Sequence, residues 1–83
     1  MFYVYILKSK INGAYYIGSC ENIEKRLFQH NDGLVLSTKR YLPWGLVYKE
    51  AYDTLSKARR REKQIKSWKR RKAIEHLIKH FKI

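Results

Sequence analysis

An Asn-Gly dipeptide, Asn12-Gly13, lies between two short runs of aromatic and β-branched residues and limits the folds open to this chain. Such a dipeptide between apolar runs is a strong signal for a β-hairpin. A loop over residues 10–13 would pair Leu7 with Tyr16, whereas a two-residue loop at Asn12-Gly13 would pair Leu7 with Gly18. In both registers Tyr5, Tyr16 and Gly18 share one face, because side chains alternate along a strand. The missing side chain of Gly18 is expected to leave room there for another molecule.

The remaining sequence predicts one more strand and three helices. Aromatic and β-branched residues favour strands at 2–8, 14–20 and 44–52. Periodic apolar residues and capping side chains predict helices at 23–31, at about 55–67 and at about 70–81. The first is capped by Asn22, the second by Thr54 or Ser56, and the third packs through Ala73, Ile74, Leu77, Ile78 and Phe81. The order β-β-α-β-α-α predicts an α/β (α+β) fold, a small three-stranded antiparallel sheet flanked by helices.

Three polar residues lie within or beside apolar helical stripes. Arg26 and His30 are four residues apart and share a face with Ile23 and Leu27, so they flank the buried edge of the first helix. In the second helix, Glu62 is a single acid among six cations, yet its spacing places it on the apolar stripe formed by Leu55, Ala58 and Ile65. These positions make the three side chains candidates for a site.

The charge of the chain indicates a polyanionic partner. There are 19 lysine and arginine residues against 7 acidic residues, a formal net charge of +12 over 83 residues. Such an imbalance destabilises the folded state by self-repulsion unless a partner such as nucleic acid offsets it. The length predicts one domain over residues 1–83. Cys20 is the only cysteine, so no intrachain disulfide can form, and a cytoplasmic location is expected. No apolar run approaches the roughly 20 residues that span a membrane.

The motif residues resemble the GIY-YIG nuclease superfamily. The intact triplet Tyr16-Ile17-Gly18 follows a short hairpin, and the pair Arg26 and His30 and the late acid Glu62 follow in turn. The first triplet departs from the family pattern, because Tyr3-Val4-Tyr5 stands where Gly-Ile-Tyr is frequent and only the tyrosine is kept. The resemblance covers roughly residues 2 to 78. It is nearest to small stand-alone members related to the N-terminal nuclease module of the DNA-repair enzyme UvrC.

This resemblance implies a DNA endonuclease that uses one divalent cation, Mg²⁺ or Mn²⁺. Glu62 would hold the cation, and Arg26 would pair with the scissile phosphate, which its planar fork suits better than a lysine does. Tyr5 and Tyr16 would act through their hydroxyls, one as general base or to position the attacking water, and the other to hold the phosphate or a metal-bound water. His30 would complete the hydrogen-bonded set. A free tyrosine has a pKa of about 10, so a phenol that acts as a base needs a cationic or metal neighbour. The sequence leaves open which tyrosine that is.

A non-catalytic nucleic-acid-binding module is the alternative. Taken singly, the two tyrosines fit ordinary strand positions, and Glu62 fits an ion pair with Arg59 or Lys66. In both interpretations basic side chains bind the DNA backbone without reading its sequence. A homodimer or an accessory protein would be needed to position the substrate more selectively.

The nuclease interpretation further expects Tyr5, Tyr16, Arg26 and Glu62 to meet on one concave surface. The backbone-binding residues are expected to be Lys39, Arg40, Arg59, Arg60, Lys63, Arg70 and Arg71.

Overall fold

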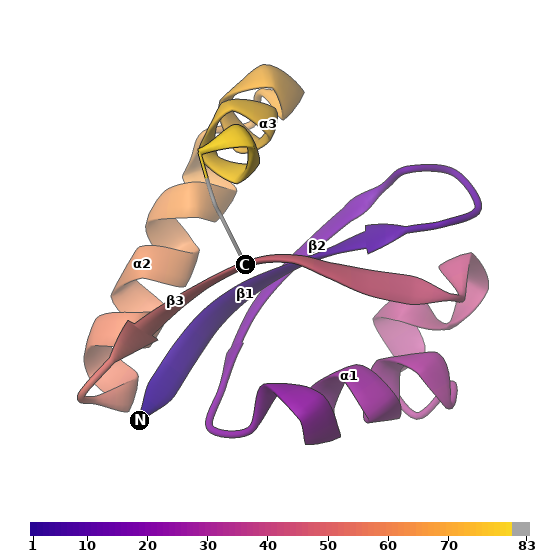
Figure 1. Ribbon diagram of the computed structural model, residues 1–83, viewed down its shortest axis with the longest axis horizontal. Helices are drawn as coiled ribbons and strands as arrows, with labels where there is room; N and C mark the ends of the chain where they lie inside the picture. Colours follow the sequence, from indigo (N-terminus) through magenta and orange to yellow (C-terminus); the bar gives the residue numbers. More distant parts are fainter. Residues whose placement is uncertain (81–83) are drawn as a thin grey trace.

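The structure is a computed structural model that describes residues 1–80 (Figure 1). The predicted order β-β-α-β-α-α is confirmed, and a short 3₁₀ helix, η1, lies in the connection between the first helix and the third strand. In chain order the elements are β1 (Phe2–Ser9), β2 (Tyr15–Cys20), α1 (Ile23–Asn31), η1 (Leu36–Tyr41), β3 (Trp44–Tyr52), α2 (Leu55–Ser67) and α3 (Arg71–Lys79).

The sheet is antiparallel, and its strand order is β2-β1-β3. Of the two predicted hairpin registers, the one with the loop over residues 10–13 is confirmed, because Leu7 pairs with Tyr16 and Tyr5 pairs with Gly18. The central strand β1 is covered on both faces, and its residues 4–7 are buried in succession. Since β1 lies between the other two, β2 is an edge strand whose outer side carries no strand within residues 1–80. That edge becomes important for the site.

Helices cover the two faces of the sheet separately (Figure 1). On the α1 face, helix α1 packs Ile23 and Leu27 against side chains that include Tyr5, Leu7 and Trp44. On the α2 face, helix α2 packs Ala58 and Ile65 against a core formed by Val4, Ile6, Ile17 and Tyr48. Helix α3 joins this second core through Ile74, Leu77 and Ile78, whereas Ala73 lines a surface hollow beside Trp68. The predicted contact of Phe81 lies outside the described residues.

The helix boundaries follow the local capping chemistry. The side chain of Asn22 accepts a hydrogen bond from the backbone of Lys25 at the start of α1. Thr54, rather than Ser56, caps α2 in the same way. Between α2 and α3, Lys69 adopts a left-handed backbone conformation with φ of 56°. This conformation ends α2 before α3 begins. Within residues 1–80, the helices are all too short or too polar to cross a membrane.

Candidate active site

Tyr5, Tyr16 and His30 form a compact aromatic cluster on the α1 face. Tyr5 and His30 are 1% and 0% exposed, and the Tyr5 hydroxyl lies 3.1 Å from Nε2 of His30. The Tyr16 ring is half-buried, with its centroid 4.7 Å from that of His30 and 6.3 Å from that of Tyr5. The structure therefore brings together three of the five predicted catalytic residues, one from each of β1, β2 and α1.

Arg26 is the fourth member of this group. Hydrogen bonding to Tyr5 raises the pKa of the Arg26 guanidinium. Burial raises the pKa of the Tyr5 hydroxyl to about 12, although the neighbouring Arg26 acts in the opposite direction. Burial, assisted by the charge of Arg26, lowers the pKa of His30 and so favours a neutral imidazole. One nitrogen of Arg26, Nη1, donates to Gln29 at 3.2 Å. Its Nε is buried and has no hydrogen-bond partner within the described chain, so this arginine retains an unused donor.

Gly18 does not leave room for a ligand, so that prediction is wrong. A Cβ atom built on this residue would lie 2.6 Å from the Tyr5 hydroxyl oxygen and 3.1 Å from Cε2 of Tyr16. Gly18 is itself buried. The glycine is required because the phenol of Tyr5 occupies the space where a side chain would be. It serves the packing of the site rather than access to it.

Glu62 lies on the other side of the sheet from both tyrosines, so the predicted meeting of all four residues on one surface is wrong. Its helix α2 packs on the opposite face, and its carboxylate accepts a hydrogen bond of 2.6 Å from the hydroxyl of Ser19. The other carboxylate oxygen pairs with Lys66 at 2.6 Å, the ion pair weighed as an alternative. The spacing of Leu55, Ala58 and Ile65 predicts Glu62 on the apolar stripe of its helix, but it does not show which face of the sheet that stripe covers.

Even so, Glu62 lies beside the edge of the sheet. Ser19 directly follows Gly18 in the edge strand β2, and successive side chains point to opposite faces. The Ser19 side chain points to the α2 face and meets Glu62, whereas Tyr16 and the cluster lie on the α1 face. The two groups are thus separated by the thickness of one edge strand, and nothing in the sheet covers that strand on its outer side within residues 1–80.

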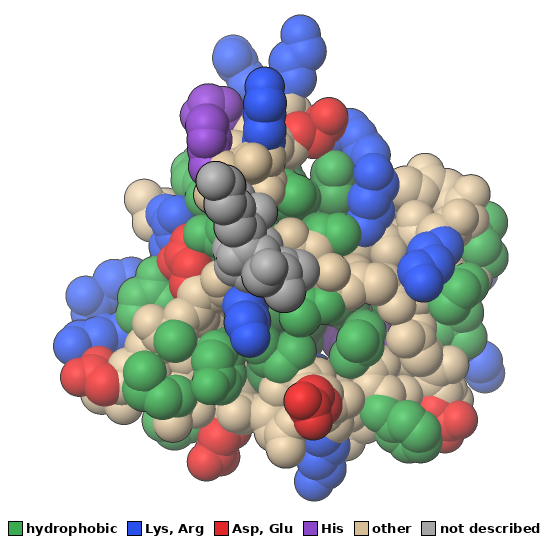
Figure 2. Space-filling view, viewed as in Figure 1, with side chains coloured by type: hydrophobic (Ala, Val, Ile, Leu, Met, Phe, Trp, Pro, Cys, Tyr) green, Lys and Arg blue, Asp and Glu red, His purple; other side chains and the backbone are tan. Residues whose placement is uncertain are grey.

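Most of the predicted DNA-binding side chains are exposed. Figure 2 shows lysine and arginine over α3 at the top of that view and over α2 at its left, with few acids between them. Arg71 differs from the others, because its guanidinium donates to the carbonyl of Gly13 at 2.8 Å and lies 4.5 Å from the Tyr15 ring centroid. It ties α3 to the hairpin. The other six of the seven predicted DNA-binding residues are exposed and have no ion pair within residues 1–80: Lys39, Arg40, Arg59, Arg60, Lys63 and Arg70.

Thr38 is a residue of the site that sequence reasoning missed. Its side chain is 1% exposed, and its Oγ1 lies 2.8 Å from Nδ1 of His30. The sequence shows only four hydroxyl or cationic residues in succession, from Ser37 to Arg40, and does not show that η1 turns one hydroxyl inward. Eight residues separate Thr38 from His30, so no helical periodicity connects them.

A second missed cluster holds β3 to α2. Glu50 accepts hydrogen bonds from the hydroxyls of Tyr48 and Tyr52 and pairs with Nε of Arg61 at 3.0 Å. Burial of Glu50 would raise its pKa, but the bonds from Arg61, Tyr48 and Tyr52 outweigh this and lower it. Arg61 also lies 5.4 Å from the ring centroid of Trp68. The signal in the sequence is the alternation Tyr48, Glu50, Tyr52, which places three polar groups on one face of a strand.

Replacing Glu50 with glutamine is expected to destabilise the fold by about 2–3 kcal/mol, because it leaves the charge of Arg61 without its carboxylate. The Arg61 side chain is 23% exposed, so the loss is smaller than for a fully buried pair. Urea unfolding measures this loss. Because the pKa of Glu50 is lowered by folding, its stabilisation is present above its usual value of 4.5 and is lost as the pH falls below that value. Asp53→Asn is the control, since its pair with Lys57 is exposed. Equal losses in both variants would contradict the role of Glu50.

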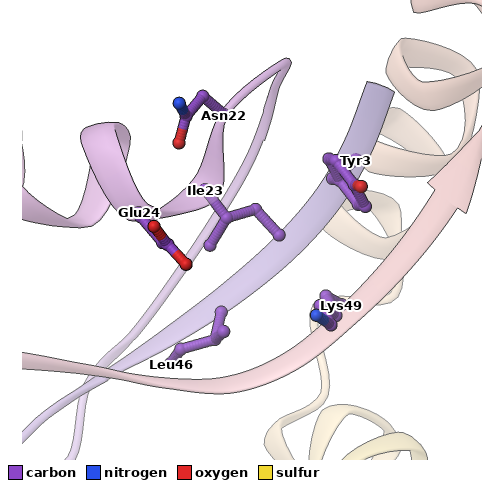
Figure 3. A pocket seen from close by; sticks show the side chains of 6 residues that line it. All are labelled: Tyr3, Asn22, Ile23, Glu24, Leu46 and Lys49. Atoms are coloured by element: carbon purple, nitrogen blue, oxygen red, sulfur yellow. The ribbon is translucent and has the colours of Figure 1, made fainter. Parts of the chain in front are cut away.

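A hollow of about 390 Å³ lies on the α1 face, beside the start of α1 (Figure 3). Ile23 and Leu46 form apolar walls, and Glu24 and Lys49 bring opposite charges to its rim. Tyr3 and Asn22 complete the lining. The hollow contains none of the five predicted catalytic residues, so it is not part of the cluster around His30.

Comparison with known proteins identifies the family. Residues 1–75 match the family model described as the GIY-YIG catalytic domain. A UPF0213 protein of Staphylococcus saprophyticus is 43% identical over 74 residues, covering 88% of this chain and 89% of the relative. A UPF0213 protein of Staphylococcus aureus is 40% identical over 78 residues, or 93% of both chains.

The fold also matches a solved structure. The solution NMR structure of a UPF0213 protein from Bacillus halodurans is 31% identical, with a TM-score of 0.59. The match covers 95% of this chain and 84% of that one. The similarity therefore extends over nearly all of this chain and most of the other.

Proposed function

Since this chain belongs to the GIY-YIG family of catalytic domains, we propose that it is an endonuclease that hydrolyses phosphodiester bonds in DNA with one divalent cation. Membership of the family supports a nuclease. The DNA substrate, the divalent cation and the roles of the individual residues belong to our proposal. The proposal also includes a cytoplasmic location, consistent with the free thiol of Cys20.

The observation that carries the proposal is Arg26, a half-buried cation that is paired with no carboxylate within residues 1–80. A guanidinium held beside two phenols without a neutralising acid is suited to an anion. Its planar fork matches two oxygens of a phosphate. In a chain of net charge +12, that anion is most simply a phosphate of nucleic acid. There the guanidinium would stabilise the negative charge that develops on the phosphorus oxygens.

Tyr16 is the better candidate for the base or for the group that orients the attacking water. Tyr5 is 1% exposed, and its hydroxyl is hydrogen-bonded to His30 and has its pKa raised to about 12. A group so placed neither meets a water molecule nor ionises readily. Tyr16 is half-buried and lies against the same histidine. We therefore assign the reacting phenol to Tyr16 and a supporting role to Tyr5.

Glu62 fits a single hard cation such as Mg²⁺. One carboxylate with water and substrate oxygens is a common way to hold this ion, and no cluster of three acidic, histidine or cysteine ligands occurs within residues 1–80. Ser19 orients one oxygen of Glu62, while the Lys66 ammonium, on a half-exposed side chain, neutralises the other and would be displaced. When bound, the cation supplies Lewis-acid stabilisation of phosphate oxygens.

A DNA strand lying along the outer edge of β2 would reach both parts of the site. The Tyr16 cluster lies on one face of β2, and Glu62, held by Ser19, lies on the other face. The exposed cations of α2, which include Arg59 and Lys63, are on the helix that carries Glu62. Such contacts to phosphates give affinity and strong salt dependence but read no bases. Selective cleavage would therefore require a homodimer or an accessory protein.

The test is Mg²⁺-dependent cleavage of DNA by the full chain, compared with its Arg26→Ala variant. Removing one group that stabilises the developing charge is expected to lower the cleavage rate about 100- to 1,000-fold. Lys25→Ala is the matched control, because it removes the exposed neighbouring cation of the same helix. Chelation of the cation should stop cleavage by the wild type.

The alternative predicts a different outcome. A non-catalytic binding module would bind DNA with the same salt dependence and cut neither duplex, single-stranded nor branched DNA in Mg²⁺ or Mn²⁺. Binding without cleavage, unchanged by Arg26→Ala, would contradict the proposed hydrolysis.

A further inference from the structure

We propose that Thr38 is a positioning residue that fixes the tautomer of His30 and, through it, the orientation of the Tyr5 hydroxyl. The effect of Thr38 on rate rests on the proposed function, whereas its effect on the imidazole does not. The three side chains form one buried series, with exposed fractions of 1% for Thr38, 0% for His30 and 1% for Tyr5. Two hydrogen bonds, of 2.8 Å and 3.1 Å, connect them.

The polarity of the series follows from its two ends. The Thr38 hydroxyl has one hydrogen, and it lies 3.2 Å from the carbonyl oxygen of Val35, which can only accept. The Thr38 oxygen is then free to accept the proton on Nδ1 of His30. Nε2 of a neutral imidazole carries the lone pair and accepts from the Tyr5 hydroxyl. In this arrangement every donor of the series has an acceptor.

The opposite polarity leaves a buried donor unsatisfied. If Thr38 donated to Nδ1, then Nε2 of His30 would carry the proton and donate to the Tyr5 oxygen. The hydrogen of the Tyr5 hydroxyl would then have no acceptor within residues 1–80 and would lie beside the cationic Arg26. A buried unsatisfied hydroxyl is unfavourable. The first polarity is therefore the stable one, and it directs the lone pairs of Tyr5 toward Arg26.

The fold holds Thr38 against the imidazole. The Trp44 indole donates to the carbonyl of Thr38 at 2.9 Å. Trp44 is in turn fixed to α1, because its backbone exchanges two hydrogen bonds with the side chain of Asn31, at 2.6 Å and 3.0 Å. The backbone of Thr38 is thus held by Trp44, and Trp44 is held by α1. These bonds keep the Thr38 hydroxyl next to the imidazole of His30.

The surroundings of His30 favour the neutral form that this arrangement needs. The groups that face its ring are Tyr5 from β1, Tyr16 from β2, Arg26 from its own helix and Thr38 from η1. Of these, Arg26 alone is charged at neutral pH, and its positive charge disfavours an imidazolium. No carboxylate contacts the ring within residues 1–80.

The experiment follows the imidazole nitrogens of His30 by ¹⁵N NMR in the full chain and in three variants. The wild type is expected to carry its proton on Nδ1. Thr38→Val removes the acceptor at nearly constant volume. Either tautomer then leaves one buried donor unpaired, so the preference for the proton on Nδ1 should be lost and the Nε2 tautomer should become populated. Thr38→Ser should preserve the wild-type tautomer, as should Ser37→Ala, which removes the exposed neighbouring hydroxyl. The cleavage rate of Thr38→Val should fall about 10- to 100-fold, the range found when metal-binding histidines lose their outer partner.

The two readouts separate this proposal from the proposed function. A proton on Nε2 in the wild type would overturn the positioning role without any variant being needed. So would an unchanged tautomer in Thr38→Val, or a changed tautomer with an unchanged cleavage rate. If the wild type cuts no DNA but the tautomer shifts as expected in Thr38→Val, the control of His30 by Thr38 is supported and the proposed hydrolysis fails.

Discussion

Replacing Glu62 with glutamine is expected to reduce DNA cleavage by at least about 1,000-fold, because a neutral amide cannot replace the carboxylate of the proposed cation site. Lewis-acid stabilisation of the transition state is worth several kcal/mol, and each 1.36 kcal/mol is about tenfold in rate. DNA binding should be unchanged or slightly tighter, since one negative charge is removed. The amide oxygen can still accept the hydrogen bond from Ser19, so the local fold is preserved.

Single-turnover cleavage in Mg²⁺, with binding measured separately, gives both quantities. Glu75→Gln is the control, because Glu75 is also paired within a helix, with Arg71, but is half-exposed on α3. The location of Glu62 makes this test decisive, since its helix covers the face opposite the Tyr16 cluster. Cleavage by Glu62→Gln at the wild-type rate would mean that the reaction is confined to the α1 face and that its cation, if any, is held elsewhere.

Local sequence signals were sufficient for the three strands and the three α-helices, but not for η1. The Asn12-Gly13 dipeptide identified the hairpin, Asn22 identified the start of α1, and the start of α2 was left open between Thr54 and Ser56 until the structure showed the cap at Thr54. The hairpin register was open between two loop lengths, and the structure resolved it through the pairing of Leu7 with Tyr16. These features depend on residues close in sequence, which is why they were predictable.

Features that depend on tertiary placement were not predictable in the same way. A helical stripe shows that Glu62 faces the sheet, but the choice of face depends on the path of β3 and the loop before α2. The space beside Gly18 is filled by a phenol from another strand, and Arg71 binds a hairpin 58 residues away in sequence. Thr38 was missed because a 3₁₀ turn, which has no strong sequence pattern, directs its hydroxyl inward.

Loss of the hydroxyl should affect mainly the cleavage rate at Tyr16 and mainly the folding free energy at Tyr5. Tyr16→Phe is expected to lower the cleavage rate about 100- to 10,000-fold, the range for a general acid or base. Its stability should be nearly unchanged, because the ring keeps its contacts with His30 and Trp44. Tyr5→Phe removes a buried hydrogen bond to His30 and should cost about 1–3 kcal/mol of folding free energy, with a smaller effect on rate.

Measuring urea unfolding and single-turnover cleavage on the same two variants tests this division. The substitutions are chemically identical and lie on the same face of the sheet, so each serves as the control for the other. The expected asymmetry arises from burial, since Tyr5 is 1% exposed and Tyr16 is only half-buried. A larger loss of rate in Tyr5→Phe than in Tyr16→Phe would transfer the reacting role to Tyr5. That result would require the buried hydroxyl to become accessible when DNA binds, by movement of β2 or of α1.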